Sequence, residues 1–137
     1  MAPQDAAPTT VSNKARIVGW VLTLLPSALL TFSGVMKFID SDELKKGFEH
    51  LGIGYDLAKP LGVLELSCVA VYLFPRTSIL GAILIAGYMG GAILAHLRIN
   101  EGFGPQIAVG VFVWLGLFLR EPRLRQLVPW RRAPSKV

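Results

Sequence analysis

Four ionisable residues lie inside or at the ends of apolar segments of this sequence. Glu65 interrupts the run 60-PLGVLELSCVAVYLF-74, Lys37 follows a long uncharged stretch, and His96 and Arg98 close another. A carboxylate or an imidazole can take up and release a proton, which makes Glu65 and His96 the candidate catalytic residues. Ammonium and guanidinium groups bind anionic or carbonyl oxygens. The candidate ligand-binding residues are therefore Lys37, Glu65, His96 and Arg98.

The same residues also admit a structural interpretation. An unpaired charge inside a bilayer costs at least about 2.5–3.5 kcal/mol, so we expect Glu65 to face the protein interior and to pair with Lys37, His96 or Arg98, or else to be protonated. Such a pair can simply tie helices together, while Lys37 and Arg98 extend to the interface, as long basic side chains at helix ends do. We interpret Glu65 as functional. For Lys37 and Arg98 the interface role is the more common one, and for His96 neither role is favoured.

The composition indicates that these residues belong to a membrane protein. Of the 137 residues, 53% are hydrophobic and 17% charged, and the mean hydropathy is +0.52, which soluble domains of this size rarely reach. The segments 17–36 and 77–95 carry no charge and are long enough to cross the hydrocarbon as helices, whereas 57–74 and 105–119 are shorter candidates. The expected fold class is all-α, an integral membrane four-helix bundle.

The expected organisation is one transmembrane domain between two tails. The domain covers 16–120, after a flexible tail, 1–15, that is rich in Pro, Ala and Thr, and before a basic tail, 121–137. Its four spans are expected at about 17–37, 57–74, 77–97 and 105–119.

Positive charges predict how the spans are oriented. With four spans both termini share one side, and most of the 14 Lys and Arg residues fall on that side. Because cytoplasmic segments are richer in Lys and Arg, we expect both termini in the cytoplasm and 38–59 outside. The four candidate residues then share the outer third of the bundle. The net charge of +5 suits basic segments that flank spans and face anionic lipid, and no soluble basic domain suggests a nucleic-acid partner.

A short amphipathic helix is expected in the outer loop, 38–59. Asp40 can cap it with Glu43 three residues later, and Gly52 is a typical stop signal. Its apolar residues recur at helical spacing, at Leu44, Phe48 and Leu51. The helix either covers the outer mouth of the bundle, which we favour, or serves as a lid.

The remaining motifs concern packing. Gly87 and Gly91 are spaced to let helices approach closely, either inside the bundle, which we favour, or between two copies in a homo-oligomer. Cys68 is the single cysteine, so it forms no internal disulfide, and it shares a helical face with Glu65 and Tyr72. The sequence shows no metal-ligand spacing and no haem or flavin signature.

Three segments resemble motifs of the DoxX-like family of small bacterial membrane proteins. In order along the first three spans they are 33-SGVMKF-38, 61-LGVLEL-66 and 90-GGAILAHLRINEG-102. The resemblance covers roughly 20–119 and implies a four-helix fold in the bacterial cytoplasmic (inner) membrane. It also implies that the recurrent polar positions of the family fall on Lys37, Glu65 and His96, with Arg98 as a further candidate.

The wider DoxX-like family includes subunits linked to quinone-coupled sulfur oxidation and components of membrane redox complexes. The resemblance therefore implies a membrane redox partner protein and a quinone or similar amphiphile as ligand. In that function Lys37 or Arg98 would hold the ligand oxygen, and Glu65 or His96 would exchange the proton. Two other functions stay open: a non-enzymatic scaffold or assembly factor, and a proton-linked transporter or channel, for which four short helices leave little room. No enzyme class follows from the sequence.

Overall fold

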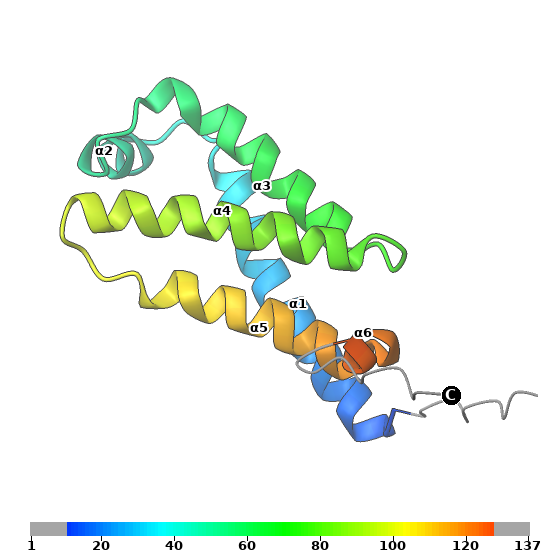
Figure 1. The fold of residues 1–137 in the computed structure, drawn as a ribbon. Coiled ribbons are helices and arrows are strands. Elements are labelled where there is room, and N and C mark those ends of the chain that lie inside the picture. Colours follow the sequence, from blue (N-terminus) through cyan, green and yellow to red (C-terminus); the bar gives the residue numbers. More distant parts are fainter. Residues whose placement is uncertain (1–10, 128–137) are drawn as a thin grey trace, which may run out of the picture.

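The computed structural model describes residues 11–127 and is built from helices (Figure 1). The four long helices are α1 (Asn13–Met36), α3 (Ala58–Leu73), α4 (Ser78–Arg98) and α5 (Gly104–Arg120). The shorter ones are α2 (Asp42–His50), the 3₁₀ helix η1 (Tyr55–Leu57) and α6 (Pro122–Leu127). The described residues contain no strand, so the predicted all-α class is confirmed.

The long helices begin and end within a few residues of the predicted segments. Pro105 lies in the first turn of α5, where the N–H that proline lacks would have no helical partner. Of the two predicted tails, 1–10 and 128–137 lie outside the described residues. The described part of the C-terminal tail forms α6, which the sequence did not predict and which buries Leu124.

Two of the helices, α1 and α4, are long and apolar enough to cross a membrane, and α5 is a shorter apolar helix. The surfaces of α1 and α4 agree with that environment, because large apolar side chains are exposed along both. Examples are Val21, Leu25, Leu29, Phe32, Ile83 and Leu94. Within α1 the hydroxyl groups of Thr23, Ser27 and Thr31 each donate to the carbonyl four residues earlier, so these polar side chains are satisfied inside an apolar helix.

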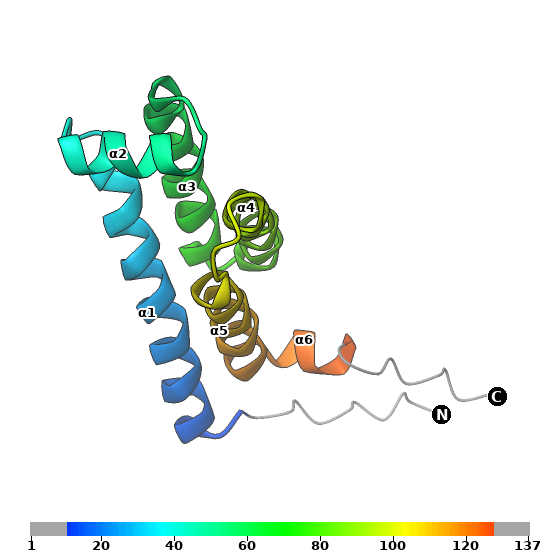
Figure 2. The same ribbon diagram turned by 90° about the vertical axis from the view of Figure 1, so that its left-hand side faces the viewer.

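The long helices close into a ring in which α1 contacts α3 and α5, and α4 contacts the same two helices. Figure 1 shows α3, α4 and α5 side by side, with α1 crossing them. One half of this bundle, which we call the packed half, contains the largest fully buried side chains. These are Thr23, Tyr72, Ile85, Val113 and Leu117. We call the other half the α2 half, because α2 lies across its end (Figure 2).

The outer-loop helix α2 is capped by Ser41 and not by Asp40 as predicted. The Ser41 hydroxyl accepts the backbone N–H three residues later, at 3.2 Å. Asp40 instead accepts a hydrogen bond from the Tyr55 hydroxyl at 2.6 Å. That bond and the nearby charge of Lys59 lower the pKa of Asp40, and the same bond raises the pKa of Tyr55. The predicted stop is confirmed at Gly52, whose φ of 65° favours glycine.

Candidate functional site

Two glycines bring α1 and α3 together in the α2 half. A Cβ added to Gly62 would lie 2.9 Å from the carbonyl oxygen of Gly34, and a Cβ added to Gly34 would lie 2.9 Å from the Leu66 side chain. Larger residues would therefore push the helices apart. Lys37 and Glu65 each follow one of these glycines by three residues, about one helical turn, so the close approach places their side chains within reach of each other.

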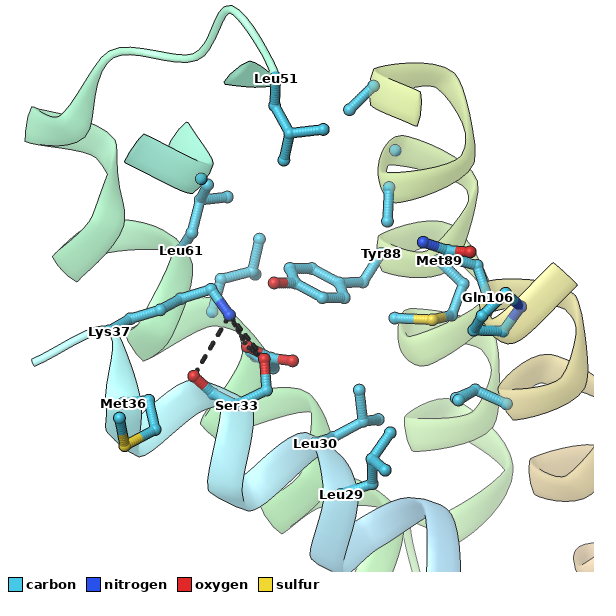
Figure 3. Close-up of a pocket in the computed structure, with 18 of the residues that line it drawn as sticks. Leu29, Leu30, Ser33, Met36, Lys37, Leu51, Leu61, Tyr88, Met89 and Gln106 are labelled. Carbon is cyan, nitrogen blue, oxygen red and sulfur yellow. Dashed lines mark hydrogen bonds and ion pairs between the residues drawn. The ribbon is translucent and has the colours of Figure 1, made fainter. Parts of the chain in front are cut away.

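Lys37 and Glu65 form a buried ion pair (Figure 3). Lys37 Nζ lies 2.6 Å from Glu65 Oε2, and the side chains are 12% and 2% exposed. Lys37 Nζ also donates to the hydroxyl and the backbone carbonyl of Ser33, at 2.8 and 3.3 Å, and the Ser33 hydroxyl donates to the same carboxylate oxygen at 3.3 Å. The prediction that Glu65 turns inward and pairs with a cation is confirmed. The Lys37 ammonium group therefore has three acceptors. The hydrogen bonds that Lys37 and Ser33 donate to the Glu65 carboxylate both end on Oε2.

A cavity of about 960 Å³ borders this ion pair. Helices α1 to α5 all contribute to its wall, and most of the side chains that line it are apolar. Its apolar lining includes Leu30, Leu44, Phe48, Leu64, Met89 and Val109. Pockets that bind small molecules have volumes of roughly 300–1,000 Å³ and combine an apolar wall with a few polar groups. The cavity therefore has the size and the chemistry of a site for an amphiphilic molecule.

The cavity wall formed by α4 and α5 carries three further polar side chains. Figure 3 shows the Tyr88 ring reaching across the cavity, with its hydroxyl directed toward the Lys37 amine. His96 Nδ1 lies 2.9 Å from the carbonyl oxygen of Ala92, and Gln106 Nε2 lies 3.3 and 3.4 Å from the two ring nitrogens of His96. Within residues 11–127 no three His, Cys, Asp or Glu side chains are grouped to hold a metal ion.

The structure brings together some of the four residues that the sequence singled out. Lys37 and Glu65 pair, and His96 lines the same cavity from α4. Arg98, the last residue of α4, is exposed and is not part of the cavity wall. All four lie at the same end of the bundle. Depth along a helix does not specify which way a side chain points, and the direction of Arg98 separates it from the others.

The sequence pattern of the DoxX-like family matches residues 21–119. This segment is more than half of the chain and contains both members of the ion pair and all four long helices in large part. The chain belongs to the DoxX-like family. This DoxX-like chain is therefore a membrane protein, as its two long apolar helices also indicate. Comparisons with curated proteins and with solved structures gave no match.

In this DoxX-like protein four polar residues line the cavity that were not among the candidate site residues: Glu43 on α2, Ser33, Tyr88 and Gln106. The sequence carried a signal for a site role of Ser33, because this residue precedes Lys37 by four positions and so lies on the same helical face. For Tyr88 the signal was spacing alone, because it lies about two helical turns before His96 on α4. Gln106 gave no signal, because a neutral residue near the start of a helix is unremarkable by type and by spacing.

Gly87 and Gly91 form part of the cavity wall of the DoxX-like bundle. A Cβ added at either glycine would meet no described atom within 4 Å, so the expected tight internal packing at these positions is wrong. Close packing on α4 occurs instead at Gly81, where an added Cβ would overlap the backbone of Tyr72. Cys68, buried one turn after Glu65, also borders the cavity. The small residues of α4 in the α2 half therefore make space for the cavity.

Helix α2 covers the cavity with its apolar face. The three predicted apolar positions, Leu44, Phe48 and Leu51, all line the cavity. An edge-to-face contact between Phe48 and Tyr55, with ring centroids 6.1 Å apart, holds α2 on one side. On another side His50 Nε2 lies 2.6 Å from Glu101 Oε1 in the loop between α4 and α5. The expected position of this helix over the end of the bundle is confirmed.

Proposed function

We propose that this DoxX-like protein binds a quinone-like or other amphiphilic molecule in its cavity and works as a subunit or accessory of a membrane redox system. One observation carries the proposal: a cavity of about 960 Å³ has an apolar wall and a buried ion pair at its edge. Ionisable groups are costly inside a membrane and are typical of functional sites there. The redox part of the proposal rests on the family resemblance.

The proposed location is the bacterial cytoplasmic (inner) membrane, with 16–120 as a four-helix membrane domain and both termini in the cytoplasm. The exposed apolar side chains of the long helices and the excess of Lys and Arg toward the termini support this arrangement. We expect a membrane-impermeant maleimide, applied to intact cells, to label a Ser41→Cys variant and to spare a Ser135→Cys variant. Both variants carry Cys68→Ala to remove the native thiol. The reverse labelling pattern would contradict the orientation.

The geometry of the ion pair decides which groups meet the ligand. Because Ser33 and Glu65 accept all three Lys37 ammonium hydrogens, Lys37 holds the carboxylate in place. Glu65, whose Oε1 none of these bonds engages, and Tyr88, whose hydroxyl is directed toward the Lys37 amine, line the cavity and are the polar groups proposed to meet the ligand. A bound quinone would supply an acceptor for two electrons and two protons. These residues fit it, because Tyr88 can donate a hydrogen bond to a carbonyl and Glu65 can hold or release a proton.

Filling the cavity tests the binding proposal. A leucine at Gly91 projects into the cavity without meeting described atoms at its Cβ, whereas Gly90, its neighbour on α4, is exposed and does not line the cavity. We expect purified wild-type protein and Gly90→Leu to bind decylubiquinone saturably in lipid nanodiscs. Gly91→Leu should bind it at least tenfold more weakly, at a melting temperature no lower than that of Gly90→Leu. Equal affinity in Gly91→Leu and Gly90→Leu would exclude this cavity as the site.

A scaffold role is the second candidate, and the saturated hydrogen bonding of Lys37 favours it. In a scaffold the pair would only fix α1 against α3. The double variant Lys37→Met/Glu65→Leu removes both charges together. A folded double variant that no longer complements a deletion strain supports the binding site, whereas a folded variant that complements fully supports the scaffold.

A further inference from the structure

The apolar face of α2 lies over open space. Leu44, Phe48 and Leu51 all line the cavity, so part of this face meets the cavity in place of packed side chains. The helix that α2 packs against most closely is η1, its neighbour in the same loop. Figure 2 shows α2 lying across the end of the bundle and not between the long helices. Elements with few buried apolar contacts open most easily, so a polar contact at the edge of α2 has a large influence on its position.

Such a polar contact joins α2 to the loop between α4 and α5. His50 Nε2 lies 2.6 Å from Glu101 Oε1, and the two side chains are 63% and 42% exposed. The other carboxylate oxygen, Glu101 Oε2, lies 4.0 Å from Nε2 of His96, which lines the cavity. The Glu101 carboxylate therefore faces one imidazole on α2 and a second imidazole on α4.

The strength of the contact depends on the charge of His50. Histidine ordinarily changes its charge between about pH 5 and 8, whereas a glutamate carboxyl is ordinarily ionised over that range. A neutral imidazole offers the carboxylate a hydrogen bond, and a protonated imidazole adds the attraction between opposite charges. The contact is therefore strongest at the acidic end of this range, and it weakens as the pH rises.

The other charged groups near the contact ordinarily keep their charge over the same range, with one exception. Arg98 lies beside the end of α2, because its Nη2 would be 3.7 Å from a Cβ added at Gly52. On α2 itself Lys46 and Glu49 precede the imidazole by four residues and by one. The exception is His96, which also titrates, but it lies on α4 directly before the loop that carries the carboxylate. Its charge therefore does not join α2 to the bundle.

We infer that α2 is a lid over the cavity, and that the contact between His50 and Glu101 is a catch that protonation of the imidazole tightens. The lid restricts access from the aqueous side most strongly at acidic pH, and access increases as the pH rises. The inference goes beyond the proposed function, because it concerns how the cavity is reached and holds for any molecule that binds there.

Thiol labelling measures access beneath α2 without a ligand. The reporter is Ala92→Cys, because Ala92 is half-buried and lines the cavity. The reference is Gly102→Cys, which is exposed and outside the cavity wall, and both variants carry Cys68→Ala. The probe is the membrane-impermeant cation trimethylammonium-ethyl methanethiosulfonate, applied to the protein in lipid nanodiscs. We expect the labelling rate of the reporter, divided by that of the reference, to rise about two- to fivefold between about pH 5.5 and 8, the factor that exposed ion pairs supply.

Three further substitutions identify the groups that cause this change. His50→Gln keeps a hydrogen-bond donor but takes up no proton, so it should abolish the pH dependence and raise the labelling ratio at the acidic end to the value at the basic end. Glu101→Gln should have the same effect, because it removes the charge that attracts the imidazolium. The matched control is Glu49→Gln, which removes an exposed carboxylate next to His50 on α2 and should keep the pH dependence.

Each other outcome contradicts a part of the inference. A labelling ratio that does not change with pH would show that α2 is not a lid with a titrating catch. A pH dependence that persists in His50→Gln and disappears in Glu101→Gln would assign the effect to His96 and overturn the role of His50. Equal changes in Glu49→Gln and Glu101→Gln would show only that the cationic probe responds to local charge. The proposed function is tested separately, because failure to bind decylubiquinone leaves these labelling results unchanged.

Discussion

The packed half and the α2 half of the bundle use their buried polar residues differently. In the packed half the Tyr72 hydroxyl donates to the carbonyl of Val113 at 2.8 Å and lies 3.3 Å from Thr23 Oγ1, and both side chains are fully buried. In the α2 half Glu65 is buried to a similar degree, yet it borders a cavity of about 960 Å³. Polar groups that meet only protein partners secure the fold, whereas those that border a cavity are available to a ligand.

Close backbone approach accounts for the difference between the two halves. In the packed half a Cβ added to Gly19 would lie 3.0 Å from the carbonyl oxygen of Gly116, so α1 and α5 touch there, and Gly81 meets the backbone of Tyr72. In the α2 half Gly87 faces open space instead. Stability is therefore concentrated in the packed half, and the cavity can be altered with little effect on the fold.

The largest expected effect comes from breaking the ion pair, the one place where the α2 half resembles the packed half. Glu65→Leu alone should lower the free energy of unfolding by about 3–5 kcal/mol, because it leaves Lys37 charged and buried without its partner. The double variant Lys37→Met/Glu65→Leu should recover most of that loss. Denaturation of the purified variants in detergent measures the loss of stability in the single variant and its recovery in the double variant. A double variant as unstable as Glu65→Leu would show that the pair itself maintains the fold.

Alanine substitution of a glycine in each half should give effects of opposite sign. Gly81→Ala should destabilise by about 1–3 kcal/mol or more, because its Cβ overlaps the Tyr72 backbone. Gly87→Ala should stabilise by about 0.5–1 kcal/mol, because its Cβ meets no described atom and alanine is the better helix former. Melting temperatures of the two variants test the contrast. The same sign and size in both would remove the distinction between the halves.

A smaller effect on stability should follow when one tyrosine hydroxyl is removed from each half. Tyr72→Phe should cost about 1 kcal/mol of stability, because the buried bond to the Val113 carbonyl is lost. Tyr88→Phe should cost less stability than Tyr72→Phe, because the Tyr88 side chain lines the cavity and its hydroxyl reaches across it toward the Lys37 amine. Instead, it should weaken the binding of decylubiquinone. Loss of stability in Tyr88→Phe would assign that residue to the fold.

The smallest expected effect lies outside the bundle, at the segment that precedes α2. Tyr55→Phe removes the hydrogen bond that lowers the pKa of Asp40, so that pKa should rise toward its ordinary value of 3.8. Because the pKa of Asp40 is lower in the folded protein than its ordinary value of 3.8, the Asp40 carboxylate stabilises the fold above pH 3.8. That stabilisation is lost as the pH falls through the pKa that Asp40 has in the folded state. Because the pKa of Tyr55 is raised above its ordinary value of 10.0, the protonated Tyr55 hydroxyl stabilises the fold up to pH 10.0. That stabilisation is lost as the pH rises through the pKa that Tyr55 has in the folded state. NMR titration of the Asp40 carboxyl measures the shift in its pKa. An unchanged pKa would show that the charges of Lys59 and Lys45 set it without the Tyr55 hydrogen bond.

The sequence by itself determined the helices and the need for a partner at Glu65. Apolar segments of sufficient length specify the four long helices, because an apolar environment requires the backbone to satisfy its own hydrogen bonds. The cost of a buried charge required a cation or a proton for Glu65, and Lys37 supplies the cation. Helical spacing also placed the apolar face of α2, since Leu44, Phe48 and Leu51 recur with the period of the helix.

Only the tertiary structure decided which residues share the cavity. The rotation of each helix about its axis turns Arg98 outward and brings Tyr88 and Gln106 inward, and rotation depends on contacts with neighbouring helices that lie far away in the sequence. The glycines show the same dependence: Gly34 and Gly62 join two helices, whereas Gly87 faces open space. Glycine has no side chain at any of these positions. The distance to the opposite helix therefore determines whether the glycine allows two helices to touch or leaves space for a cavity.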